Sequence, residues 1–231
     1  MKQHRAAVFV DGENWSKSVR KEFGTALHDV DHRSLFEALV QHRTLSLVRW
    51  YSSRRTDNEA EEYRKRFCQT LQSTDPRITI REGRTLRRSI TVPEALELNR
   101  YLGELAHPDS RVKLDKQVYH RLKGIGSKLK KLQIPVEKEV DVMLALDFVR
   151  LADLNLYDSA YLLSADGDFV PVIEAVRDTQ RSDGTRRDVY VVSPRNASAL
   201  ARVATNFIPL NRAWISPFLK LASKKFPRSI A

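Results

Sequence analysis

The stretch Ala6-Ala7-Val8-Phe9-Val10-Asp11-Gly12 decides the fold class, because it is a short and nearly continuous apolar run that stops at a polar loop. Runs of this kind are typical of strands that are buried on both faces of a parallel sheet. The stretch therefore predicts a first strand that ends at Asp11.

Strand and helix patterns alternate along most of the remaining chain. Further strand patterns occupy residues 45–51, 78–80, 160–164 and 188–192, and helix patterns occupy 31–40, 58–72, 139–154, 172–176 and 196–204. Strands separated by helices pair in parallel, with helices on both faces of the sheet. We therefore expect an α/β fold with three layers, α/β/α, around a mostly parallel sheet of about five strands. The helix at 139–154 has apolar residues on most of its faces and should be largely buried.

The alternation weakens between about residues 82 and 135. This segment contains Pro93 and Pro108, Gly124 and Gly126, and many Lys and Arg residues within weakly helical sequence. We interpret it as a basic insertion in a single domain that spans residues 1–211. Residues 212–231 are then a basic C-terminal helix or tail.

The charge of the chain indicates an acidic partner. The formal net charge is +11 over 231 residues, and the isoelectric point is about 9.9. Lys and Arg spread over a surface attract polyphosphate without selecting a sequence, so RNA is the expected partner. Solubility alone is the other explanation of such a surface. Within the insertion, Lys128, Lys130 and Lys131 are the expected RNA contacts, although an ordinary solvated helix face explains them nearly as well.

Other features of the sequence concern the compartment. No apolar run approaches the roughly 20 residues that cross a bilayer, and the first residues lack the cleavage site of a signal peptide. We expect a cytoplasmic protein without membrane contact. The single cysteine, Cys68, excludes an internal disulfide and a cysteine-based zinc cluster. The six histidines show no metal-ligand spacing and are expected at the surface, and Trp15 is expected to pack rather than to stack on a base.

Four aspartates are expected at one edge of the sheet. Asp11 and Asp166 each follow a strand, and the carboxyl ends of parallel strands meet at the edge where open α/β sheets bind ligands. Asp168 and Asp141 lie at the beginning of helices that start from the same edge. Such a cluster is repulsive unless divalent cations neutralise it, and carboxylate oxygens suit Mg²⁺ or Mn²⁺. Ions held there would activate a water for phosphodiester hydrolysis.

Three segments together resemble the NYN domain family, which is LabA-like and belongs to the PIN-like ribonucleases. They are Val8-Phe9-Val10-Asp11-Gly12-Glu13-Asn14, the run from Glu137 to Asp147, and Leu163-Ser164-Ala165-Asp166-Gly167-Asp168-Phe169. The resemblance implies a PIN-like fold and an RNA nuclease that depends on Mg²⁺ or Mn²⁺. Carried over by position, the metal-binding and catalytic acids would be Asp11, Asp141, Asp166 and Asp168.

The resemblance also implies softer roles for three polar residues. Asn14 would orient a carboxylate or meet the substrate, Lys138 would contact a phosphate, and Ser164 would cap its turn. The chain departs from the family at Glu139, where relatives often have glycine. The extra negative charge would either help to bind the metal or perturb its binding. Asp147 matches a family acid, but it lies within an apolar helix, so we expect a buried, hydrogen-bonded structural role.

Three functions remain open from the sequence. The first is a metal-dependent ribonuclease that acts on single-stranded or structured RNA and cuts it internally. The second is a non-catalytic RNA-binding regulatory module that retains the PIN-like fold. The third is a phosphatase, for which an Asp-x-Asp motif after the first strand is missing because position 13 is Glu13. A homodimer is compatible with all three.

Overall fold

The structure is a computed structural model that describes residues 4–89, 93–107, 115–130, 133–181 and 183–220. The chain divides into two compact units. The first consists of Met1–Arg84 and Lys138–Ala231, and the second of Thr85–Glu137. Within the described ranges, no helix has the length and apolar character needed to cross a membrane.

A parallel sheet forms the centre of the first unit. Its strands lie in the order β3 (Ile78–Ser89), β2 (Thr44–Ser53), β1 (Arg5–Asp11), β5 (Ser159–Leu163), β6 (Asp188–Ser193) and β7 (Asn206–Pro209), and each neighbouring pair is parallel. β4 (Gln133–Lys138) is the neighbour of β3 on the side away from β2. The predicted α/β fold with a mostly parallel sheet is confirmed. In the described residues the parallel strands number six rather than about five, because β7 has only four residues and does not stand out in the sequence.

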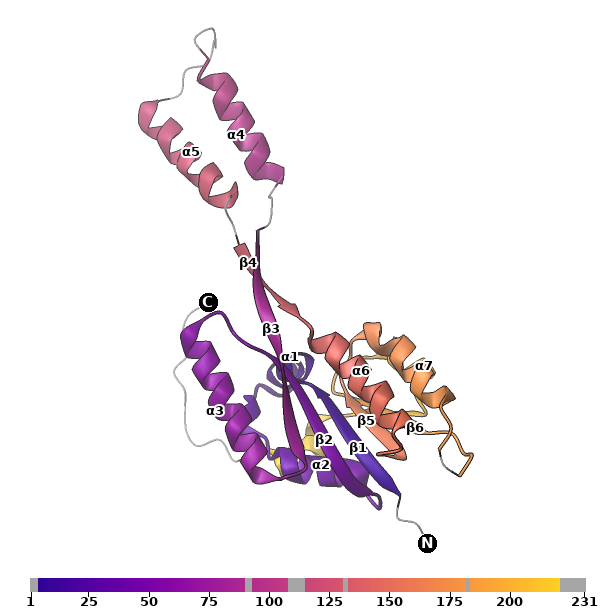
Figure 1. Ribbon diagram of the computed structural model, residues 1–231. Helices are drawn as coiled ribbons and strands as arrows, with labels where there is room; N and C mark the ends of the chain where they lie inside the picture. The colour runs from indigo at the N-terminus through magenta and orange to yellow at the C-terminus, as the bar shows by residue number, and fades with distance from the viewer. Residues whose placement is uncertain (1–3, 90–92, 108–114, 131–132, 182, 221–231) are drawn as a thin grey trace. The chain divides into compact units, whose positions relative to one another are not determined.

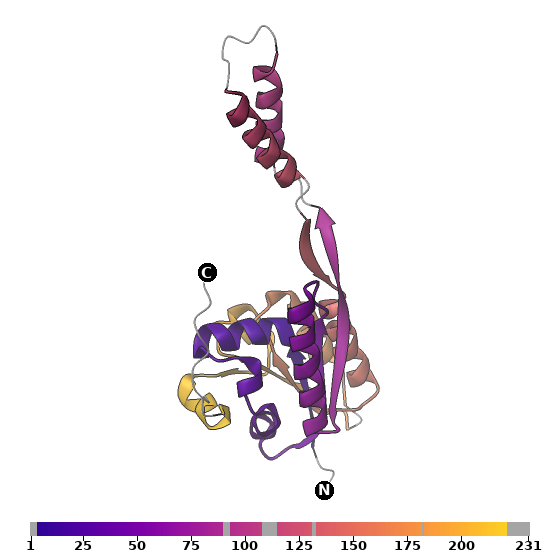
Figure 2. The ribbon, with the colours of Figure 1, turned by 90° about the vertical axis from the view of Figure 1, so that its left-hand side faces the viewer.

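Helices cover both faces of this sheet (Figures 1 and 2). Helices α1 (Gly12–Phe23), α2 (His32–Val40) and α3 (Asn58–Thr74), with α9 (Arg212–Ile215), contribute to one apolar core. Helices α6 (Val140–Asp153), α7 (Val170–Asp178) and α8 (Ser198–Val203) contribute to the other. Short 3₁₀ turns at Leu27–Asp29, Gly167–Phe169 and Ser216–Phe218 complete the unit. The predicted three-layer arrangement is therefore present.

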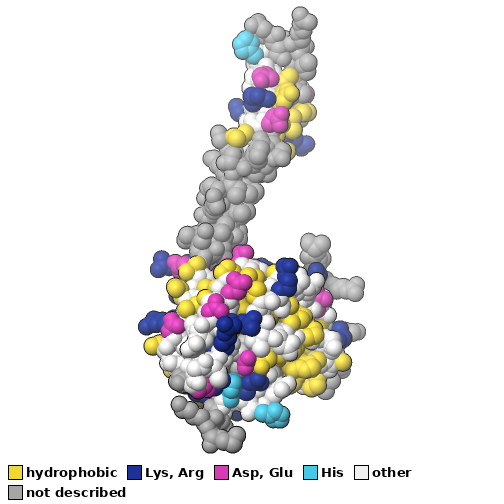
Figure 3. All heavy atoms as spheres, turned by 90° about the vertical axis from the view of Figure 1, so that its right-hand side faces the viewer, with side chains coloured by type: hydrophobic (Ala, Val, Ile, Leu, Met, Phe, Trp, Pro, Cys, Tyr) yellow, Lys and Arg dark blue, Asp and Glu magenta, His cyan; other side chains and the backbone are white. Residues whose placement is uncertain are grey.

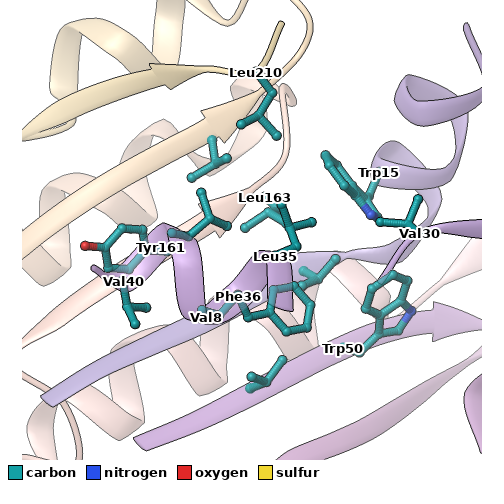
Figure 4. Close-up of a cluster of buried hydrophobic side chains, with 14 of the residues drawn as sticks. Val8, Trp15, Val30, Leu35, Phe36, Val40, Trp50, Tyr161, Leu163 and Leu210 are labelled. Atoms are coloured by element: carbon teal, nitrogen blue, oxygen red, sulfur yellow. The ribbon is translucent and has the colours of Figure 1, made fainter. Parts of the chain in front are cut away.

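Strand β1 is buried on both faces, which explains its continuous apolar sequence. Val8 and Val10 belong to the core under α1 and α2, part of which is drawn in Figure 4. Ala7 and Phe9 point to the opposite face and belong to the core under α6 and α7. By the same alternation, Asp11 follows Phe9 onto the α6 side.

Helix α1 is not evident from the sequence pattern, and its environment corrects one prediction. Trp15 is buried, and its indole N–H donates to Nε2 of His32 over 3.2 Å. His32 is buried as well, so its expected surface position is wrong. Burial lowers the pKa of His32 to about 3 and keeps the ring neutral. This hydrogen bond joins α1 to α2.

Helix α6 is less buried than its sequence predicts. Leu144 and Phe148 are fully buried, but Val142 and Leu146 are 63% and 64% exposed. A helix on the outer layer of a three-layer fold has one side in solvent, and here that side carries apolar residues.

Among its described residues, the second unit contains the helices α4 (Pro93–Leu105) and α5 (Lys116–Lys130), which lie side by side (Figure 1). Gly126 allows their close approach, because a Cβ atom there would lie 2.9 Å from the amide nitrogen and oxygen of Asn99. Leu102 is buried, whereas Tyr101 and Ile125 are exposed.

Candidate active site

The order of the strands reverses between β1 and β5. The chain places β2 and β3 on one side of β1, and β5, β6 and β7 on the other. The carboxyl ends of the two strands at such a reversal leave a crevice in which open α/β sheets bind ligands. Val10 pairs with Leu163, so Asp11 and Ser164 end their strands side by side.

Asp11 lies at this reversal and is almost fully buried. It is the N-cap of α1, because its Oδ1 accepts a hydrogen bond from the backbone N–H of Asn14 over 3.1 Å. Its other oxygen, Oδ2, accepts a hydrogen bond from the hydroxyl group of Ser164 over 2.9 Å. Burial raises the pKa of Asp11 to about 6, with smaller contributions from the negative charges of Asp141 and Asp166.

Ser164 and Asn14 hold the loop after β5 against the beginning of α1. Ser164 Oγ accepts the backbone N–H of Asp166 over 3.1 Å. Oδ1 of Asn14 accepts the backbone N–H of Ala165 over 3.1 Å. Asp166 in turn caps the 3₁₀ turn by accepting the N–H of Asp168 over 3.0 Å. Ser164 thus caps its turn as expected, and it also joins two of the predicted acids.

Asp141 reaches the same edge from the first turn of α6. Its pKa is raised, first by partial burial and then by the charges of Asp166 and Asp168. Lys17 on α1 opposes this shift, so its ammonium group also lies near the acids. The sequence interpretation missed Lys17. The available signal was its position one helical turn after Asn14, which required α1 to be recognised first.

The four aspartates are electrostatic neighbours, and their chemistry fits a hard divalent cation. The charges of Asp141 and Asp166 raise the pKa of Asp11. The charges of Asp166 and Asp168 raise the pKa of Asp141. In the described part of the chain, no group of three His, Cys, Asp or Glu side chains is already arranged around a common metal position. Rotation of these carboxylates would have to bring their oxygens together, and Asp141 and Asp168 are exposed enough to rotate.

Glu139 and Asp147, the two other acids near the motifs, have separate partners. Glu139 has a left-handed backbone with φ 76°, and its carboxylate lies 3.6 Å from the guanidinium group of Arg84. Asp147 is buried and accepts hydrogen bonds from the hydroxyl of Tyr51 over 2.9 Å and from Nε of Arg81 over 3.0 Å. The structural role predicted for Asp147 is confirmed, and Arg84 offsets the extra charge of Glu139.

The cationic residues expected to meet RNA are only partly described. Lys128 is exposed on α5 in the second unit. Lys131 lies outside the described residues, as do the side chains of Lys130 and Lys138. On the face of the molecule seen in Figure 3, side chains of both charges are interspersed with apolar ones, so the positive charge is not concentrated there.

Comparison with known proteins identifies the family of the chain and a solved structure with a similar fold. The family model for the NYN domain matches residues 5–211. A crystal structure of a protein of unknown function from Vibrio parahaemolyticus superposes with a TM-score of 0.52 at 16% sequence identity, covering 91% of this chain and 94% of that chain. That likeness shows a shared fold. No curated protein matches the chain.

Proposed function

The chain belongs to the NYN domain family, and from this premise we propose that it is a ribonuclease that hydrolyses RNA phosphodiester bonds with the help of Mg²⁺ or Mn²⁺. The observation that carries the proposal is the joining of Asp11, Ser164 and Asp166 by hydrogen bonds at the reversal of the strand order. Ligand crevices of parallel α/β sheets form at this position.

In the proposed site, Asp11, Asp141, Asp166 and Asp168 hold the divalent cation. The cation would supply a more acidic bound water and offset the charge that develops on the phosphate. Ser164 and Asn14 act as positioning residues, because their hydrogen bonds fix Asp11 and the loop that carries Asp166. The raised pKa of Asp11 supports this arrangement, since a cation would relieve the repulsion that contributes to it.

The substrate class follows from charge. The net charge of +11 favours a polyanion, and we propose RNA, single-stranded or structured, that is cut within the strand. Lys128, Lys130, Lys131 and Lys138 are the proposed phosphate contacts. A position at the carboxyl edge of an open sheet leaves room for a continuous strand to pass, which fits internal cleavage.

The test compares cleavage of labelled RNA by the wild type, Asp11→Asn, Asp166→Asn and the control Asp178→Asn. Asp178 is an exposed acid at the end of α7, so its replacement should leave activity unchanged. We expect cleavage with Mn²⁺ or Mg²⁺, none with EDTA, and a loss of at least about a hundredfold in both site variants. Full activity of folded Asp11→Asn and Asp166→Asn would contradict the proposal. RNA binding without turnover by the wild type would support the non-catalytic alternative instead.

A further inference from the structure

An open cavity of about 620 Å³ lies beside the candidate active site in the first unit. It begins at Gly12 and Glu13, which directly follow Asp11, and extends over Trp50 and Ser52 at the end of β2 to the first turns of α3. Its volume is within the range of small-molecule pockets, which is about 300–1,000 Å³. The cavity therefore has room for a group as large as a nucleotide.

Helix α1 is the wall shared by the cavity and the acids. Glu13, Ser16 and Arg20 line the cavity and recur at intervals of three and four residues, so they form one face of the helix. Asn14 and Lys17 lie on the neighbouring face, where Asn14 binds the loop before Asp166 and Lys17 acts on Asp141. Helix α1 therefore connects the acids to the cavity and is the surface along which a bound strand would run.

Aromatic rings form much of the apolar lining. Trp50 and Phe67 pack with their ring centroids 5.3 Å apart. Tyr63 lines the cavity as well and is 46% exposed, and its ring contacts His28 edge-on at 5.7 Å. Trp50 is buried, so the exposed ring of Tyr63 is the surface on which a base can stack, whatever its sequence.

The polar lining suits the rest of a nucleotide. Arg20 and Arg55 are exposed, and the guanidinium group of Arg55 pairs with buried Glu13. The two cations can meet phosphate oxygens. The carboxylate of Glu13 can accept hydrogen bonds from the N–H groups on the edge of a base. Stacking surface, cations and a buried acceptor therefore occur together in one cavity next to the acids.

We propose that this cavity binds the base of a nucleotide adjacent to the cleaved phosphate in single-stranded RNA. The proposal rests on the proposed ribonuclease function, since it assigns the neighbouring residue of the same substrate. Paired bases are stacked within a helix and are not free to enter, so the cavity makes the protein select unpaired RNA.

The first test measures binding without cleavage, by fluorescence anisotropy of a labelled single-stranded RNA in EDTA. Ala60→Leu fills space at the lining without adding a ring on which a base could stack, and Arg20→Ala removes a cation. Ala175→Leu on α7 and Arg150→Ala on α6 are matched exposed controls. We expect about tenfold weaker binding for each cavity variant and no change for either control.

An abasic strand separates recognition of a base from attraction to phosphate. The wild type should bind the intact strand about tenfold more tightly than the abasic strand, and Ala60→Leu should bind the two alike. If Ala60→Leu does not fold, as judged by circular dichroism, Arg20→Ala alone decides the first test. Wild-type affinity of the folded cavity variants, or equal binding of abasic and intact strands by the wild type, would overturn the proposal.

Cleavage assays on the same variants distinguish the two proposals. If the wild type cuts RNA and both cavity variants cut it equally well, the ribonuclease stands and the cavity assignment fails. If the wild type cuts no RNA but the cavity variants bind intact RNA more weakly than the controls, the base-binding cavity stands and the ribonuclease fails.

Discussion

Asp11 combines a position suited to catalysis with an unfavourable environment. Its carboxylate is buried at the end of the central strand, and burial with neighbouring acids raises its pKa to about 6. Two hydrogen bonds, from Asn14 and Ser164, partly compensate. At neutral pH the folded protein therefore bears the cost of a buried charge, as expected where function rather than stability determines a residue.

Asp11→Asn should stabilise the fold at neutral pH in EDTA. The native carboxyl keeps its proton up to about pH 6, whereas an aspartate in the unfolded chain has a pKa of 3.8, so stability from this group is lost as pH rises through that window. Asparagine still caps a helix. We expect the free energy of unfolding in urea to exceed that of the wild type by roughly 1–3 kcal/mol at pH 7, and the difference to vanish below about pH 4.

The control for this measurement is Asp178→Asn, which should follow the wild type at every pH. Addition of Mn²⁺ should raise the stability of the wild type and the control, but not that of Asp11→Asn. A constant difference between Asp11→Asn and the wild type across the pH range would show that the charge of Asp11 is not responsible.

At the scale of elements, the sequence predicted the strands that are fully buried, because their residues are almost all apolar. β5 is buried throughout and β1 is buried from Ala6 onward, and their apolar runs identified the strands that lead to Asp11 and Asp166. α1 was missed because only its inner residues, Trp15, Val19 and Phe23, are apolar among many charges. Without α1, the position of Lys17 and the contact of Asn14 with Ala165 could not be predicted. Tertiary contacts, not local patterns, determine them.

The turn from β1 into α1 depends on a glycine. A Cβ atom on Gly12 would lie 2.4 Å from the carbonyl oxygen of Tyr51 and 2.6 Å from Nε1 of Trp50. Gly12→Ala should therefore displace the beginning of α1, lower the free energy of unfolding by about 1–3 kcal/mol and reduce RNA cleavage. Urea unfolding and the cleavage assay measure the two effects.

Gly103→Ala in α4 is the matched control. The space around Gly103 is open, and alanine is the better helix former, so this variant should be as stable as the wild type or up to about 1 kcal/mol more stable. If Gly12→Ala were as stable and active as the control, the close approach of β2 to α1 would not constrain the site.

At the scale of the whole molecule, the catalytic proposal concerns the first unit alone. All four candidate acids and the cavity belong to it. The second unit contributes eleven Lys or Arg residues against six Asp or Glu residues, which is a large share of the net charge. Its role in RNA binding, a cytoplasmic location and a homodimer remain predictions from the sequence.

Replacing Thr85–Glu137 by a short Gly-rich linker should leave the first unit folded. The two ends of the removed segment are close, since Arg84 pairs with Glu139 over 3.6 Å. We expect a cooperative thermal transition and retained cleavage, with weaker RNA binding that depends less steeply on salt because cations have been removed. Anisotropy at several salt concentrations measures this dependence. An unfolded product, or an unchanged salt dependence, would show that the second unit stabilises the fold or takes no part in binding.

The central position of β1 has a consequence for local fluctuations. The strand has parallel neighbours along both edges and apolar layers above and below, so its amide protons reach solvent only when most of the unit opens. Deuterium would accordingly enter this strand last. The backbone leading to Asp11 is thereby among the least mobile parts of the chain, while the exposed Asp168 at the opposite side of the reversal is free to adapt to what binds.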